Sequence, residues 1–182
     1  MNRFLCFRFG VLAVAACKTH QTAESITPAD EAFMREAILL SVESVAQGGG
    51  PFGAVIVKDG EIIASCSNSV TLDNDPTAHA EINAIRAACR ALGTFDLDSC
   101  VIYASCEPCP MCLGAIYWAG IDRIYYANTR QDAEAIAFAD NFIYEDMDRP
   151  MAQRNIPIIQ LLRDEAQSAF RAWTEKVDKT EY

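Results

Sequence analysis

Apolar positions recur at helical spacing in the first structured block of the chain, which begins near Thr27. Thr27 is typical of a helix N-cap, and Pro28 and the acidic residues after it suit a first turn. The run from Gly48 to Gly50 ends the pattern. We therefore expect an amphipathic helix here. Its apolar positions are Phe33, Ala37, Leu40 and Val45.

The next two blocks predict a β-hairpin and a second helix. The stretch "PFGAVIVKDGEIIASCSN" contains two β-rich runs on either side of Asp59-Gly60, a dipeptide that strongly favours a tight hairpin turn. From Pro76 to about Leu92 the apolar spacing is helical again, and Gly93 stops it.

Strands and helices alternate in the following part. "CVIYAS" reads as a buried strand, "MCLGAIYWAG" as a short helix and "DRIYYAN" as another strand. A hairpin followed by strand, helix and strand predicts an α/β domain. We expect a three-layer α/β/α sandwich, with a mixed central sheet of about five strands and helices on both faces.

The C-terminal part has a weaker pattern. Residues 130–150 look helical but show no single apolar face, "IPIIQLL" (156–162) could be a last strand, and residues 164–182 predict an amphipathic helix.

Composition narrows the range of functions. The chain has 182 residues, enough for one domain core, and a net charge of −10. That charge disfavours binding to nucleic acid, which relies on lysine and arginine contacts to phosphates. Three of the eight cysteines crowd into "CEPCPMC" at a spacing suited to metal, and a reduced, cytoplasmic compartment fits this usage.

Residues 1–26 form an N-terminal extension or signal-like segment, so the expected domain spans residues 27–182. Two arginines precede an apolar run, and "VAAC" ending at Cys17 resembles a lipoprotein processing box, with Cys17 as the lipidated residue. Alternatively, translation starts further on, or the segment is an unstructured extension. The apolar run is too short to span a membrane.

Two motifs 30 residues apart carry the candidate chemistry. His79 and Glu81 lie at a predicted helix start, and Cys109 and Cys112 lie at a predicted strand-to-helix turn. One imidazole and two thiolates can hold a tetrahedral zinc ion and leave its fourth position to water, as in catalytic sites. Glu81 can then move the proton of that water. Cys106 is expected near the site but not on the metal.

Each motif alone has an ordinary explanation. A histidine or glutamate at a helix start is commonly a cap-region residue, and a lone Cys-x-x-Cys is commonly a structural zinc site or a redox pair. The combination of His-x-Glu with Pro-Cys-x-x-Cys is far more specific, because it is the signature of the zinc deaminases.

Beyond these motifs, the chain resembles the bacterial guanine deaminases of the cytidine deaminase-like superfamily. The resemblance runs from about Asp30 to Tyr182 and rests on "GGPFGAVIVKDG", "NDPTAHAE", "SCEPCPMCLGAIYWA", "FIYEDMDRP" and the terminal "EY". It implies a cytidine deaminase-like fold, one zinc ion per subunit and hydrolysis of guanine to xanthine and ammonia.

The resemblance also implies roles for further residues. Asn68 would hydrogen-bond the purine, Asp140 would read the guanine edge, Tyr182 would close the pocket, and Glu145 would also contact substrate. It further implies a homodimer whose segment of about 131–182 is exchanged, so that Asp140 and Tyr182 serve the partner's site.

Other functions stay open from the sequence. The same motifs would serve deamination of guanosine or of another aminated ring such as an aminotriazine. A tRNA adenosine deaminase fits the acidic composition poorly. A non-catalytic module with a closed zinc site is a third possibility, with Cys106 as the fourth ligand.

Overall fold

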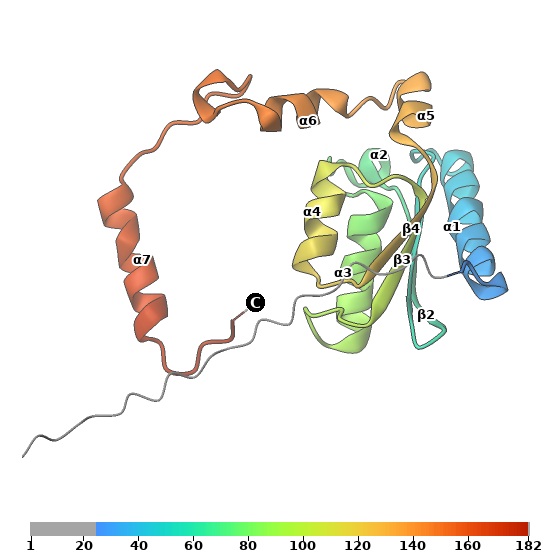
Figure 1. Cartoon of the computed structure of the whole chain (residues 1–182), viewed down its shortest axis with the longest axis horizontal. Coiled ribbons are helices and arrows are strands. Elements are labelled where there is room, and N and C mark those ends of the chain that lie inside the picture. The colour runs from blue at the N-terminus through green and yellow to red at the C-terminus, as the bar shows by residue number, and fades with distance from the viewer. Residues whose placement is uncertain (1–24, 182) are drawn as a thin grey trace, which may run out of the picture.

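A mixed sheet of four strands forms the middle layer of the folded body (Figure 1). The computed structural model describes residues 25–181. Strand β1 is antiparallel to both of its neighbours, whereas β3 and β4 run parallel. The predicted α/β architecture is confirmed, with four strands in the described chain instead of about five. In the order β2-β1-β3-β4, they are β1 (Gly53–Lys58), β2 (Glu61–Ser67), β3 (Cys100–Cys106) and β4 (Arg123–Asn128).

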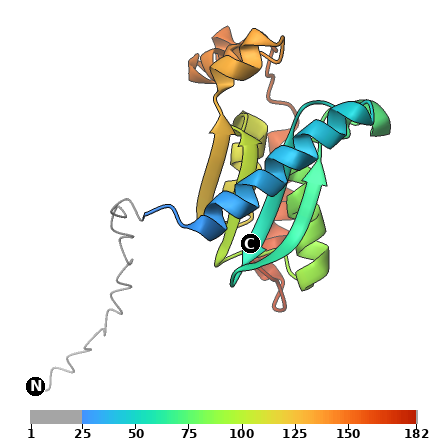
Figure 2. The same cartoon turned by 90° about the vertical axis from the view of Figure 1, so that its right-hand side faces the viewer.

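Helices cover both faces of this sheet, as Figure 2 shows. Helix α1 (Pro28–Ala46) lies on one face, and α3 (Ala80–Leu92) and α4 (Pro110–Trp118) lie on the other. Apolar side chains fill both interfaces, because packing a helix against the sheet removes their apolar surface from water. Buried residues of the larger core, between the sheet and α3 and α4, include Ile56, Leu97, Ile102 and Ile116.

Polar contacts fix α1 on the sheet. Thr27 caps the helix in a capping box with Asp30, and Asp30 also accepts a 2.6 Å hydrogen bond from the Tyr103 hydroxyl of β3. Gly53 opens β1 directly beneath the helix, where a Cβ atom would clash with the carbonyl oxygen of Ala37. The helix can approach the strand this closely only because residue 53 has no side chain.

The expected turns are present. Asp59 and Gly60 both have positive φ, 52° and 79°, as a two-residue hairpin turn requires. Gly93, with φ 67°, ends α3 in the left-handed conformation.

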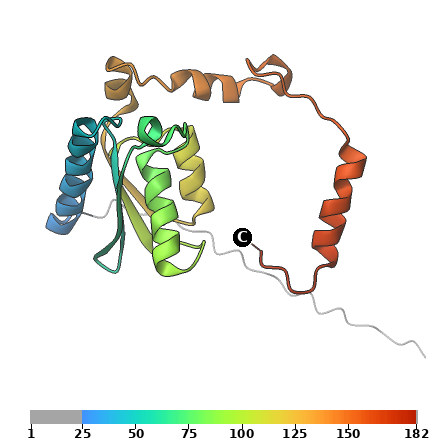
Figure 3. The same cartoon turned by 180° about the vertical axis from the view of Figure 1, so that it is seen from behind.

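After β4 the chain leaves the sheet, and one expected element is absent. The helical character expected over 130–150 is confirmed in two separate helices, α5 (Arg130–Ala135) and α6 (Asn141–Asp148), with Ala137 in between at φ 71°. Residues 156–162 form no strand, because a strand needs a neighbouring strand edge and this stretch lies away from the sheet (Figures 1 and 3). Ile159 and Leu161 are 84% and 79% exposed.

The last helix, α7 (Arg163–Glu175), follows a short 3₁₀ turn, η1 (Met151–Gln153). It stands apart from the sheet and its covering helices in Figures 1 and 3, and Phe170 and Trp173 on it remain exposed. None of the helices within residues 25–181 combines the length and apolar character that a membrane crossing demands.

Candidate active site

Two helix starts bring the expected metal ligands together. His79 is the N-cap residue of α3, Cys109 is the N-cap residue of α4, and Cys112 lies in the first turn of α4. His79 Nδ1 is 3.6 Å from Cys109 Sγ and 3.5 Å from Cys112 Sγ, and all three ligand atoms lie within 4.8 Å of one another. A tetrahedral zinc ion separates such nitrogen and sulfur ligands by about 3.5 Å, so the donor set fits this metal.

The pKa values of the two thiols are shifted in opposite directions. A hydrogen bond from Cys112 and the neighbouring His79 together lower the pKa of Cys109 to about 4. The same hydrogen bond raises the pKa of Cys112. A pair that already holds one thiolate is prepared for a divalent cation, which displaces the remaining proton.

Glu81 lies beside this cluster in the first turn of α3 and is only 7% exposed. Burial raises the pKa of its carboxyl group, because desolvation disfavours the charged form. A carboxyl whose pKa is raised towards neutrality can both accept and return a proton, which is what acid-base catalysis requires.

Asn68 follows β2 and is buried beside a glycine-rich loop. Its Oδ1 accepts hydrogen bonds of 3.2 Å from the backbone N–H groups of Gly50 and Val70. These two donors fix the orientation of the Asn68 amide, and the residue lines the cavity described below. A Cβ at Gly50 would lie 3.1 Å from this oxygen, so a side chain there would require the Asn68 amide to move by a few tenths of an ångström.

A cavity of about 510 Å³ joins these residues. Its wall also includes the segment from Arg130 to Ile143 of the same chain, with Asp140 half-buried on it. Burial raises the pKa of Asp140. Phe52 and Phe138 meet edge to face across the lining, with ring centroids 5.0 Å apart.

This arrangement corrects one expectation. Asp140 was expected to serve a partner's site, but here it lines the cavity of its own chain. The reason is topological: α5 follows β4 directly, and β4 lies beside β3, whose end carries the Cys106–Cys109 turn. Directly after β4, the chain therefore passes over its own site.

Other predicted residues lie elsewhere. Glu145 is exposed on α6, accepts a 2.8 Å hydrogen bond from Asn141 and does not line the cavity. Tyr182 and Cys17 lie outside the described residues.

Cys106 lines the cavity but is not in the metal-ligand cluster of the described chain, since its thiol donates to the Thr129 carbonyl. Burial raises its pKa to about 11.

Two charged residues of the cavity lining could not be named as site residues from the sequence. Glu107 and Arg130 both line the cavity, and the backbone N–H of Arg130 donates to the Glu107 carboxylate at 3.2 Å. Glu107 stands inside the cysteine motif, so its position there could have indicated a role. Arg130 begins a block without a clear apolar face, so no pattern pointed to it.

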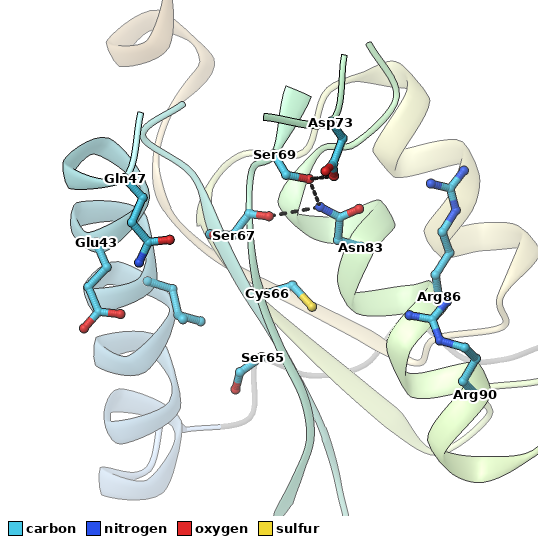
Figure 4. A pocket seen from close by; sticks show the side chains of 11 residues that line it. Glu43, Gln47, Ser65, Cys66, Ser67, Ser69, Asp73, Asn83, Arg86 and Arg90 are labelled. Atoms are coloured by element: carbon cyan, nitrogen blue, oxygen red, sulfur yellow. Dashed lines mark hydrogen bonds between the residues drawn. The ribbon is translucent and has the colours of Figure 1, made fainter. Parts of the chain in front are cut away.

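A second cavity, of about 540 Å³, lies along the outer edge of β2 (Figure 4). Arg86 and Arg90 of α3 stand on one side of it, and Glu43 and Gln47 of α1 stand on the other. None of the metal-ligand cluster lines this cavity. The candidate chemistry therefore belongs to the cavity that contains Glu81.

Comparison with known proteins agrees with this geometry. Residues 27–128 match the family model of the cytidine and deoxycytidylate deaminase zinc-binding region. A guanine deaminase of Bacillus subtilis is 54% identical over 153 residues, which are 84% of this chain and 98% of that protein. Its X-ray structure superposes with a TM-score of 0.81, which confirms the cytidine deaminase-like fold.

Two other relatives show how far the similarity extends. A solved guanine deaminase of Nitrosomonas europaea is 31% identical, with a TM-score of 0.60, and the match covers 94% of this chain and 97% of that one. A tRNA-specific adenosine deaminase of Aquifex aeolicus is 42% identical over 97 residues, which are 53% of this chain and 64% of that protein. The chain therefore belongs to the zinc-binding cytidine and deoxycytidylate deaminase family, and within it to the guanine deaminases.

Proposed function

We propose that this chain catalyses the hydrolysis of guanine to xanthine and ammonia, with one zinc ion per subunit held by His79, Cys109 and Cys112. The observation that carries the proposal is the cavity lined by His79, Cys109 and the buried Glu81, with Cys112 beside them in the ligand cluster. The similarity to guanine deaminases over most of the chain supports guanine as the substrate.

Glu81 has the central role in the proposed chemistry. Zinc bound at this site lowers the pKa of a water molecule towards neutrality. Glu81 would take one proton from the attacking water while the water oxygen forms a bond to C2 of guanine, and would deliver this proton to N3. Glu81 would then carry the proton of the C2 hydroxyl to the amine, so that the C2–N bond breaks, ammonia leaves and the C2 carbonyl of xanthine forms. The raised pKa of Glu81 suits a group that carries protons in both directions.

Asn68 and Asp140 orient the base in this proposal. Asn68 donates from its amide N–H groups to an acceptor on the purine ring, since its oxygen is already bonded to Gly50 and Val70. Asp140 accepts from N–H groups on the guanine edge. We do not assign Glu145 to the substrate, because it is exposed outside the cavity lining.

We also propose a homodimer in which the chain after α6 is exchanged, with Tyr182 closing the partner's cavity. The exposed apolar residues of 156–162 and α7 support this, since such surfaces normally pack against another chain. Tyr117 and Trp118, 78% and 76% exposed on α4, offer a second apolar contact surface.

Deamination of tRNA is the weaker alternative. The net charge of −10 opposes binding to a phosphate backbone, and the match to a tRNA-specific relative covers only 53% of the chain. Deamination of guanosine is a further alternative. It would require the cavity to hold a ribose in addition to the base, and the substrate panel below distinguishes the two substrates.

A substrate panel tests the proposal directly. The zinc-loaded chain would be given guanine, guanosine, cytidine and tRNA, and ammonia release would be followed. We expect turnover of guanine well above the other three. Preference for guanosine, cytidine or tRNA would refute guanine as the substrate, and inactivity on all four would refute the deaminase assignment.

A further inference from the structure

A side chain of α6 contacts the turn that carries the zinc ligand Cys109. The hydroxyl of Tyr144 donates to the Pro108 carbonyl, with oxygen atoms 3.4 Å apart. The Arg130 guanidinium carbon lies 5.0 Å from the centre of the Tyr144 ring, within the range of a cation–π contact.

The surface that receives Tyr144 is itself firmly connected. The backbone N–H of Glu107 donates to the Asn128 carbonyl at 2.8 Å, and that of Arg130 donates to the Glu107 side chain. These bonds join the end of β3 to the start of α5. Tyr144 therefore contacts two parts of one connected unit, the Pro108 carbonyl and the Arg130 side chain.

Asp140 lies at the other end of the same short helical stretch. It is the N-cap residue of α6, one turn before Tyr144, and it lines the cavity. Much of the rest of α6 is exposed, including Phe142 at 63% and Met147 at 58%, and no residue of this helix is buried. The edge-to-face pair of Phe138 with Phe52 holds the chain just before this turn. Tyr144 is the contact that attaches the helix itself to the turn that carries Cys109.

We propose that Tyr144 is a positioning residue that holds Asp140 against the substrate edge, through its hydroxyl on Pro108 and its ring under Arg130. The inference rests on the proposed function, because it uses the contact between Asp140 and guanine. Tyr144 need not touch the substrate, and it does not line the cavity. Its effect reaches the reaction through Asp140.

The test is a double-mutant cycle of Tyr144→Phe and Asp140→Asn in the zinc-loaded full chain, with guanine kinetics as the readout. Tyr144→Phe keeps the ring but removes the hydroxyl, so we expect the Michaelis constant to rise by about two- to tenfold, the usual effect of one hydrogen bond. Zinc content should not change. In the Asp140→Asn background, Tyr144→Phe should have no further effect.

Tyr126→Phe is the matched control, because it removes a half-exposed hydroxyl from β4 and should leave guanine kinetics unchanged. Additive effects of Tyr144→Phe and Asp140→Asn would overturn the proposal, and so would an unchanged Michaelis constant in Tyr144→Phe. If the unmodified chain failed to turn over guanine, the proposed function itself would be wrong.

Hydrogen exchange provides a measurement that needs no substrate. Tyr144→Phe should speed amide exchange across residues 140–148 and leave α3 and α4 protected, because only the attachment of α6 is weakened. Unchanged exchange in 140–148 would show that Tyr144 does not hold this helix, whatever the substrate is.

Discussion

Burial raises the pKa of the Glu81 carboxyl above its ordinary value, and we propose that this group moves protons during the reaction. Replacement by glutamine keeps the size and removes the ionisable group. We expect Glu81→Gln to lower kcat for guanine by about 10²- to 10⁴-fold, the usual contribution of a positioned acid-base group, with zinc content and melting temperature nearly unchanged. Steady-state kinetics, metal analysis and thermal unfolding measure these three quantities. Near-normal turnover would refute the proton-transfer role.

The three cysteines of the motif differ in their surroundings, and this predicts different effects on the metal. Cys112→Ala removes one of three ligands, so we expect its zinc content to fall far below one ion per chain after dialysis. Cys106→Ala is the matched control, since its thiol donates to Thr129 instead, and it should keep its zinc. Loss of zinc from Cys106→Ala would favour a closed structural site.

At the scale of elements, the contact of α1 with β3 should make stability depend on pH. Hydrogen bonds from Thr27 and Tyr103 lower the pKa of Asp30 below its usual value. A depressed folded-state pKa stabilises the protein above the unfolded-state pKa, near 4, and that stability is lost as the pH falls through the folded-state value.

Asp30→Asn should therefore lower the melting temperature at neutral pH, and the difference from the unmodified chain should shrink below about pH 4. Thermal unfolding from pH 3 to pH 8 measures this. Asp59→Asn, in the exposed hairpin turn, is a matched control without this contact to β3. A difference that stays constant across the range would show that the charge of Asp30 does not stabilise the fold.

At the scale of the whole molecule, the exposed C-terminal segment predicts cooperation between two chains. Deleting Lys179 to Tyr182 should raise the Michaelis constant for guanine or abolish turnover, because a cavity that is not closed admits water and loses ring contacts. Zinc content should stay the same, since these residues are not among the ligands.

Mixing this deletion variant with Glu81→Gln should restore part of the activity after subunits exchange. One hybrid site would then combine an intact Glu81 from one chain with an intact tail from the other. Activity assays of the mixture and sedimentation of each variant test this. A fully active monomer without the four residues would contradict the exchange.

The local features of this protein could be predicted from its sequence because each depends on residues close together in the chain. The Thr27 cap, the Asp59-Gly60 turn and the Gly93 stop are determined by local backbone preferences. The metal ligands could be named because zinc chemistry restricts both residue type and spacing, so His79 and the Cys109–Cys112 pair were recognisable before any contact was known.

Only the tertiary structure decided how distant segments meet. It placed Asp140 in the cavity of its own chain, Glu107 beside Arg130, and Tyr144 on Pro108. It also left residues 156–162 without a strand partner, although their composition favours a strand. The physical reason is that a strand or a substrate contact depends on what lies opposite it, and that neighbour is determined by the path of the whole chain.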